Sequence, residues 1–169
     1  MAGNMGPWSI RLEALRSGLR TPFRLSERAD TEGNWRNKVD VKGLTAVHVR
    51  LDDFRSYGHG AFMIGREYYR RALEHLSSRD SSIAVFSDEP KEASALLTSA
   101  GADPSAIISW STEDPAFDLV QLSRFPRIVC SNSSFSLWGA LSSSGAQVVL
   151  PEGLGRPYQD WASLPWTPP

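Results

Sequence analysis

The chain has 169 residues, of which 41% are hydrophobic and 22% are charged, a composition that permits one globular domain with a buried core. Its formal net charge of −1 excludes the broad positive field that nucleic acid binding needs, although a local basic pocket for one diphosphate remains open. The only cysteine, Cys130, excludes an internal disulfide and a cysteine-based zinc cage. No apolar run approaches the ~20 residues of a membrane-spanning helix, and the first residues lack a secretory pattern. We therefore expect a soluble protein.

The chain divides into an irregular first segment and a regular α/β pattern. Residues 1–43 are rich in Arg, Gly and Asn, with one short helix predicted at Arg11–Leu19. From Leu44, short β-branched runs alternate with amphipathic stretches, which is typical of βαβ units and predicts a parallel sheet covered on both faces. The predicted strands are 44–50, 82–86, 107–108, 127–130 and 147–150, and the predicted helices are 62–76, 91–99, 117–123 and 135–141.

The segment that follows the first predicted strand combines a histidine, an arginine and two carboxylates. It reads His-Val-Arg-Leu-Asp-Asp over residues 48–53, at the carboxyl end of a strand, where open α/β sheets bind their ligands. Strand alternation points His48 and Arg50 to the same side. A guanidinium there can fork onto two phosphate oxygens and stabilise the charge on a departing nucleoside diphosphate. The alternative is a strand-end ion pair between Arg50 and Asp53.

A second candidate is the polar turn that leads from a buried strand into an apolar helix at residues 129–140. Asn132, Ser133 and Ser134 can each cap the helix, and the turn would leave backbone N–H groups pointing outward at the helix N-terminus, which attracts phosphate. One alternative is a helix cap without a ligand. The same three residues also match a glycosylation sequon, which the position of the turn at the sheet edge disfavours.

Two aspartates that follow later strands could recognise a nucleotide base. Asp88 lies in Phe-Ser-Asp-Glu and Asp118 in Phe-Asp-Leu-Val-Gln-Leu-Ser. A carboxylate can accept paired hydrogen bonds from N1–H and the exocyclic amine of guanine, a donor pattern that adenine does not offer on that edge. As structural alternatives, Asp88 would cap a helix and Asp118 would be a solvated helix charge.

In this order, the four segments resemble the α-1,2-fucosyltransferase family, glycosyltransferase family 11, over about residues 44–151. The family shows His-x-Arg-Arg-x-Asp, Phe-Ser-Asp, Asp-Leu-x-x-Met-Ser and Asn-Ser-Ser-Phe-Ser-x-Trp elements, and the last, at residues 132–138, is the most specific. The resemblance implies the Rossmann-like, nucleotide-binding half of a GT-B glycosyltransferase. It also implies inverting transfer of L-fucose from GDP-fucose to a galactoside hydroxyl.

The resemblance assigns roles to individual residues. Arg50 would hold the donor diphosphate, His48 would lie against the nucleotide, and Asp118 would contact guanine. The turn at 133–136 would cradle phosphate, with no metal or other cofactor, because a helix end and an arginine take the place of a divalent ion. The expected ligands are GDP-fucose and a galactose-containing glycan. The predicted donor site comprises His48, Arg50, Asp88, Asp118, Asn132, Ser133, Ser134, Phe135 and Ser136.

An inverting displacement also needs a general base for the acceptor hydroxyl. His59, in the Tyr-Gly-His-Gly loop at 57–60, has a suitable pKa range. Asp53 is the second candidate, although Arg50 would lower its basicity. With Arg50, these two residues form the predicted catalytic set. The alternative for His59 is a plain loop residue.

The sequence departs from the family at Leu51, which stands where the family has a second arginine, and at its front end. Residues 1–43 are too few for the family's N-terminal domain, so we interpret them as its remnant, followed by a donor-binding domain at 44–155 and a Trp- and Pro-rich tail at 156–169 that wraps over the surface. An apolar face could therefore await a partner domain.

Two other functions stay open. The chain could be a truncated or inactive GDP-sugar-binding module without efficient transfer. It could also be a phosphohydrolase that uses Asp52, Asp53 and Asp88 around a metal. We expect a cytoplasmic location, with peripheral membrane association, or the Golgi membrane in a eukaryote.

Overall fold

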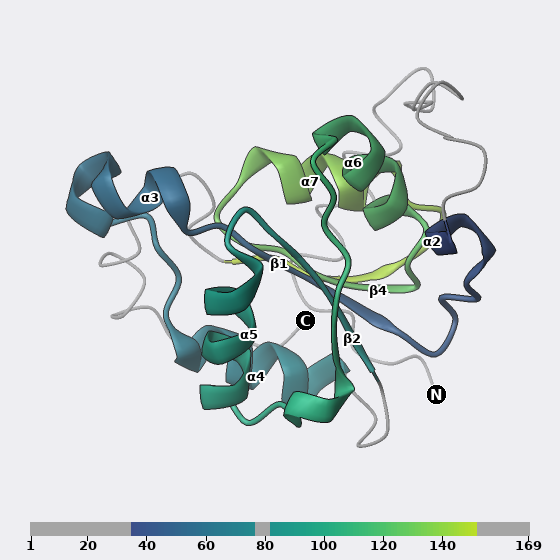
Figure 1. Cartoon of the computed structure of the whole chain (residues 1–169), viewed down its shortest axis with the longest axis horizontal. Helices are drawn as coiled ribbons and strands as arrows, with labels where there is room; N and C mark the ends of the chain where they lie inside the picture. The colour runs from purple at the N-terminus through teal and green to yellow at the C-terminus, as the bar shows by residue number, and fades with distance from the viewer. Residues whose placement is uncertain (1–34, 77–81, 152–169) are drawn as a thin grey trace, which may run out of the picture.

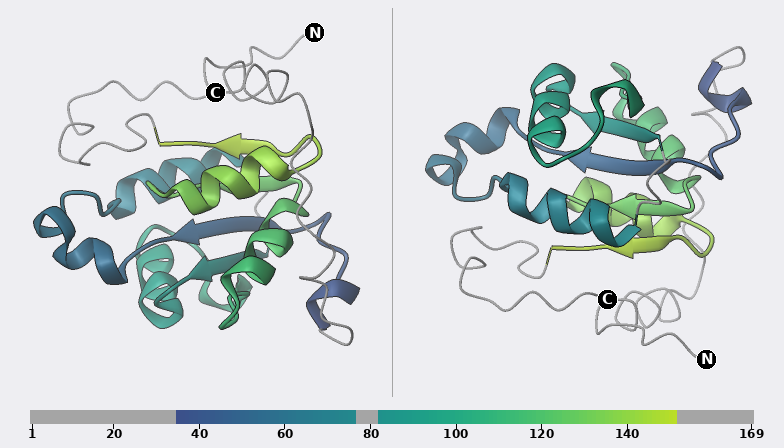
Figure 2. Two further views of the ribbon diagram at one scale, coloured as in Figure 1. Left: turned by 90° about the horizontal axis from the view of Figure 1, so that it is seen from above. Right: turned by 90° about the horizontal axis from the view of Figure 1, so that it is seen from below.

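The computed structural model describes residues 35–76 and 82–151, which form a parallel sheet with helices on both faces (Figure 1, Figure 2). Its five strands are β1 (Thr45–Val49), β2 (Ile83–Ser87), β3 (Ile107–Ser109), β4 (Arg127–Val129) and β5 (Gln147–Val149). They lie in the order β3-β2-β1-β4-β5, and every pairing is parallel. This order is that of a Rossmann-like sheet, so the predicted α/β fold class is confirmed.

The central strands are buried along their whole length. All five residues of β1 and all five of β2 are buried, as expected for parallel strands covered from both sides. In register, Val47 of β1 lies opposite Val85 of β2 and Val129 of β4. Branched side chains at such positions pack well against their neighbours on a pleated surface, which explains why these runs form strands.

Two helices cover each face of the sheet. The helices α4 (Arg66–Leu76) and α5 (Pro90–Ser99) lie on one face, and α6 (Pro115–Ser123) and α7 (Ser134–Ser142) lie on the other (Figure 1). Alternation along β1 divides its side chains between two cores, because Val47 and Val49 pack with α4 and α5, whereas Ala46 packs with α6 and α7. The same alternation sends His48 and Arg50 toward the α6/α7 face.

Local sequence signals set the ends of α5, as predicted, and the start of α6, which lies two residues before the predicted Phe117. Pro90 begins α5, and Gly101 follows its end with φ +99°, a conformation that glycine adopts without strain. Asp114 caps α6, since its side chain accepts hydrogen bonds from the N–H groups of Ala116 and Phe117.

The helix predicted at 62–76 is wrong at its start, because α4 begins only at Arg66. After β1 the chain forms α3 (Asp52–Ser56) and the 3-10 helix η2 (Tyr57–Gly60). It must then return to the α4/α5 face, and it buries Ile64 there before the helix begins. The ring of Phe62 packs on Tyr57 and Phe54 instead of lying on α4.

The segment at 1–43 is described only from residue 35, and the helix predicted at 11–19 and the tail at 156–169 lie outside the described residues. Its described part contains α2 (Trp35–Lys38). Arg36 Nε donates to the backbone oxygen of Trp110, at 2.7 Å, and thereby holds α2 against the segment after β3, which itself follows η3 (Pro104–Ala106). Within 35–76 and 82–151, no helix has the length and apolar character needed to span a bilayer.

Candidate functional site

The carboxyl ends of β1 and β4 meet at a topological switch point of the sheet. From β1 the chain proceeds to β2 and β3 on one side, and it then crosses to β4 and β5 on the other. Crevices at such points bind ligands in open α/β sheets. Side chains from both sides meet here, since Nδ1 of His48 lies 2.7 Å from Oγ of Ser131, the second residue after β4.

A pocket of about 140 Å³ opens at this edge, on the α6/α7 face. His48 and Arg50 both line it, as strand alternation predicts. Ligand pockets usually measure roughly 300–1,000 Å³, so this one is large enough for only part of a nucleoside diphosphate. The described residues that line it are His48, Arg50, Phe86, Ser87, Asp88, Ser111, Thr112, Pro115, Asp118 and Phe135.

Arg50 is the cation of this pocket. Its Nε donates to Asp53 Oδ1 at 2.8 Å and lies 3.3 Å from Asp88 Oδ2. The hydrogen bond to Asp53 raises the pKa of Arg50 further, so the guanidinium is always charged. Both contacts use Nε, and neither Nη group bonds to a residue that the structure describes. The ion pair considered from the sequence is thus present, and the fork that binds anions remains available.

Asp88 connects the ends of two neighbouring strands. Its carboxylate accepts the backbone N–H groups of Leu51, at 3.1 Å, and Asp52, at 3.0 Å. These groups lie at the N-terminus of α3, whose own N-cap residue makes no side-chain hydrogen bond. Asp88, the first residue after β2, therefore caps α3 as well as contacting Arg50.

Asp118 lines the pocket and is buried, so it is not the solvated helix charge that the sequence left open. Only 6% of its surface is exposed, and both carboxylate oxygens accept the backbone N–H of Thr112, at 3.0 and 2.9 Å. The hydroxyl of Thr112 donates to it as well. Burial raises the pKa of Asp118, and the bonds from Thr112 act against this rise. A carboxylate has about four acceptor positions, so some capacity for a ligand remains.

His48 lines the pocket as a neutral ring. Its ring stacks on Phe135 of α7, with centroids 5.1 Å apart. Burial lowers the pKa of His48 to about 4, and the positive charge of Arg50 acts in the same direction, while Asp88 opposes it. Near pH 7 the imidazole is therefore uncharged and can act as a hydrogen-bond donor at one nitrogen and an acceptor at the other.

Most side chains of the polar turn before α7 form hydrogen bonds within the protein. Ser133 is the N-cap, because its hydroxyl accepts the N–H of Phe135 at 3.3 Å. Asn132 Nδ2 donates to the backbone oxygen of Phe62, and the buried Ser136 hydroxyl donates to the backbone oxygen of Ser133. Of residues 132–136, only Phe135 lines the pocket, while Ser134 is exposed. Among residues 132–136, the side chain of Phe135 is thus the part of the α7 N-terminus that reaches the pocket.

Neither predicted general base lines the pocket. Asp53 is exposed on α3, and its hydrogen bond with Arg50 lowers the pKa of the carboxyl, which weakens it as a base. His59 is exposed in η2 and has φ +53°, a left-handed conformation that is uncommon outside glycine and asparagine. The structure thus brings Arg50 to the pocket but not the two bases.

Sequence reasoning missed Ser111, Thr112 and Ser131 as site residues. Each follows the carboxyl end of a strand by a few residues, β3 for the first two and β4 for the third. Position after a strand end is the signal that could have found them. Their single hydroxyl groups carry no distinctive motif, so only the sheet order shows that they converge.

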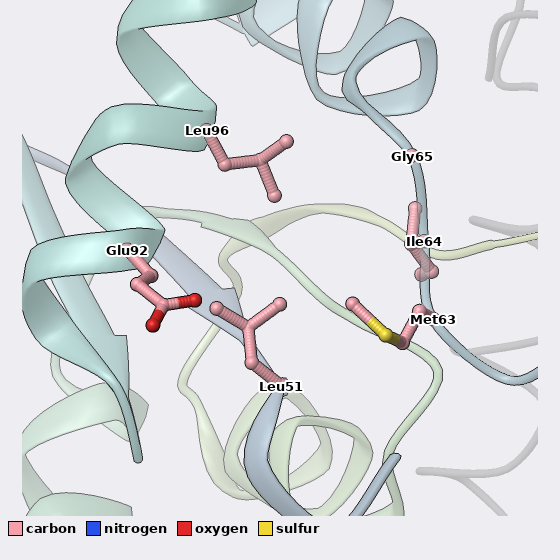
Figure 3. A pocket seen from close by; sticks show the side chains of 6 residues that line it. All are labelled: Leu51, Met63, Ile64, Gly65, Glu92 and Leu96. Carbon is pink, nitrogen blue, oxygen red and sulfur yellow. The ribbon is translucent and has the colours of Figure 1, made fainter. Parts of the chain in front are cut away.

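A second pocket, of about 390 Å³, lies on the opposite face of the sheet (Figure 3). Leu51, Met63 and Leu96 point into it from three different segments, and Glu92 lies at its edge. Glu92 pairs with Arg55, which does not line the pocket, and the described lining residues include no Lys or Arg to bind a phosphate. This pocket contains none of the predicted site residues.

The fold and the first pocket define the chain as a Rossmann-like α/β domain with a pocket at the carboxyl edge of its sheet that is lined by both charged and aromatic side chains. The described residues include no group of three or more His, Cys, Asp or Glu side chains placed to hold a metal ion. Comparison with family models, curated proteins and solved structures finds no match to the chain.

Proposed function

We propose that the pocket at the switch point binds the GDP part of GDP-fucose, and that this domain is the donor-binding half of an inverting GT-B fucosyltransferase that uses a galactoside hydroxyl as acceptor. The observation that carries the proposal is the state of Arg50. Two carboxylates contact its guanidinium through Nε, and neither Nη group bonds to a described residue, which leaves both as potential donors to an anion.

The other residues of the pocket suit the two ends of a guanosine diphosphate. Arg50 and the nearby N-terminus of α7 supply positive charge for the diphosphate. Asp118 offers a fixed carboxylate that can accept hydrogen bonds from guanine. In a displacement at fucose C1, Arg50 would stabilise the charge that develops on the departing diphosphate.

A second candidate is a GDP-sugar-binding module that does not transfer efficiently. This alternative is supported by the absence of His59 and Asp53 from the pocket lining, and by the lowered pKa of Asp53. Without a general base beside the reacting hydroxyl, the domain would bind the donor but leave the acceptor unactivated.

Calorimetric titration with GDP tests the binding step, with UDP as the control ligand and a chelator present throughout. We expect GDP to bind without metal and to bind more tightly than UDP. Arg50→Ala should abolish binding, because it removes the only side-chain cation that lines the pocket among the described residues. Arg70→Ala, on the exposed face of α4, is the matched control and should leave affinity unchanged.

An Arg50→Ala variant that binds GDP as well as the parent chain would remove Arg50 from the site. Transfer is measured separately, by following radiolabelled fucose from GDP-fucose to a galactoside. GDP binding combined with transfer favours the enzyme, and GDP binding without transfer favours the binding module. If neither nucleotide binds, both proposals fail.

A further inference from the structure

The contact between His48 and Ser131 joins the two halves of the sheet inside the protein. The two residues lie 83 positions apart in the sequence, and their exposed fractions are 4% and 1%. A hydrogen bond of 2.7 Å between two buried side chains carries a cost if either partner is misoriented, because a buried polar atom without a partner is destabilising. The direction of the bond therefore matters.

Counting donors and acceptors fixes that direction. Oγ of Ser131 makes no other hydrogen bond to a described residue. If Nδ1–H of His48 donated to this oxygen, the serine's own hydrogen would be buried without an acceptor. If the serine donates to an unprotonated Nδ1, its hydrogen is satisfied and the ring proton moves to Nε2.

We propose that Ser131 is a positioning residue, whose hydroxyl donates to Nδ1 of His48 and thereby holds the ring in the tautomer that presents Nε2–H to the pocket. His48 lines that pocket, and Nε2 is neither bonded to a described residue nor sealed from solvent. The result is a neutral donor, aimed at the space where the ligand binds.

Neighbouring side chains hold the pair in place. The hydroxyl of Tyr69 donates to the backbone oxygen of His48 at 3.3 Å, and that of Tyr68 donates to the backbone oxygen of Cys130, just before Ser131, at 2.6 Å. Phe135 stacks on the imidazole from the α7 side. Residues of α4 and α7 support the pair from opposite faces of the sheet, so packing fixes the plane of the ring. The position of the ring proton is then the remaining variable.

The ring also stays neutral over the physiological range. Burial lowers the pKa of His48 to about 4, and the charged groups that act on it are Arg50 and Asp88, whose effects oppose one another. A neutral Nε2–H can donate to a phosphate or carbonyl oxygen without adding charge to the site. The identity of that acceptor as GDP rests on the proposed function, whereas the tautomer does not.

The first test needs no ligand. Long-range ¹H–¹⁵N NMR of the free chain distinguishes protonated from unprotonated ring nitrogens, and we expect His48 to carry its proton on Nε2 at pH 7. Ser131→Ala should leave the ring as a mixture of tautomers, while Ser131→Cys, a weak donor of similar size, should restore part of the preference. A proton on Nδ1 in the parent chain would overturn the inference.

The second test measures GDP affinity by calorimetry at pH 6 and pH 8. The terminal phosphate of GDP loses a proton at about pH 6, so the parent chain should bind GDP more tightly at pH 8 than at pH 6. Ser131→Ala should lose about tenfold in affinity at both pH values, the size of one hydrogen bond to a charged acceptor. Ser143→Ala is the matched control, since this buried serine bonds to Ala140 on α7 and not to His48.

The outcomes separate the two proposals. If GDP does not bind but the Nε2 proton is present, the proposed function fails and the role of Ser131 stands. If GDP binds and Ser131→Ala affects neither affinity nor tautomer, Ser131 has no positioning role, even where the variant loses thermal stability.

Discussion

At the scale of single residues, Arg50 combines a structural contact with an open binding surface. Its Nε is committed to Asp53 and Asp88, so an arriving phosphate would add to these ion pairs and need not displace them. The carboxylates contact the guanidinium at 36% side-chain exposure, and neither Nη group bonds to a described residue. Preorganisation of this kind reduces the side-chain entropy that binding would otherwise cost.

A substitution at Asp118 tests base recognition. Asp118→Asn replaces an acceptor with a donor on one side, so it should weaken GDP by about tenfold or more and affect UDP much less, since a bidentate base contact contributes roughly 1–3 kcal/mol. Calorimetry with both nucleotides measures the ratio. If the two affinities fall together, Asp118 supports the pocket through Thr112 and does not read the base.

At the scale of elements, the two helices over the pocket pack unusually closely. A Cβ placed on Gly139 of α7 would lie 2.6 Å from Cδ2 of Leu122 and 2.9 Å from its Cγ on α6. Leu122 is fully buried and cannot swing aside. Glycine at this position therefore sets the distance between α6, which carries Asp118, and α7, which carries Phe135.

Gly139→Ala should destabilise the fold by about 1–3 kcal/mol, the usual cost of overpacking a core, despite the better helix propensity of alanine. Urea unfolding measures the change. Gly43→Ala is the matched control, because a Cβ at Gly43 would meet nothing within 4 Å. The double variant Gly139→Ala with Leu122→Ala should lose less unfolding free energy than the sum of the losses in the two single variants. Strict additivity would contradict the proposed clash.

The elements that the sequence predicts well are those whose signals are local. Pro90 and Gly101 delimit α5 within a few residues, and Ser133 caps α7 from the adjacent position. The sequence does not predict α3, because its capping carboxylate belongs to Asp88, which follows β2 and lies more than 30 residues from α3 in the sequence. The same holds for the site, where Arg50 follows from its motif, but Ser131 enters only through the sheet order.

At the scale of the whole molecule, stability depends on keeping His48 neutral. The pKa of His48 is about 4 in the folded chain and near 6.5 when unfolded. Between these values the unfolded chain binds a proton that the folded chain does not, so this contribution is complete above pH 6.5 and is lost as pH falls toward 4. The integrated loss is about 3 kcal/mol.

Urea unfolding between pH 7 and pH 4 measures this loss, with His48→Gln as the variant that cannot titrate. The difference between the two curves isolates His48 from Asp118, whose raised pKa acts in the opposite direction. His75→Gln, at an exposed site on α4, should leave the parent profile unchanged. Parallel curves for the parent and His48→Gln would show that the histidine is not buried as a neutral ring.

The place of β1 at the centre of the sheet has a consequence for how the protein folds. Pairing with β2 joins residues 38 positions apart, such as Thr45 and Ile83, whereas pairing with β4 joins residues 82 positions apart, such as Ala46 and Ile128. Loop-closure entropy favours the nearer pairing first. On the ribosome, β1, β2 and β3 emerge before β4, so Arg50 and His48 are present before the pocket wall that α7 supplies. A ligand of this pocket would thus bind only after β4 and α7 have joined the sheet, and it would stabilise only the fully folded domain.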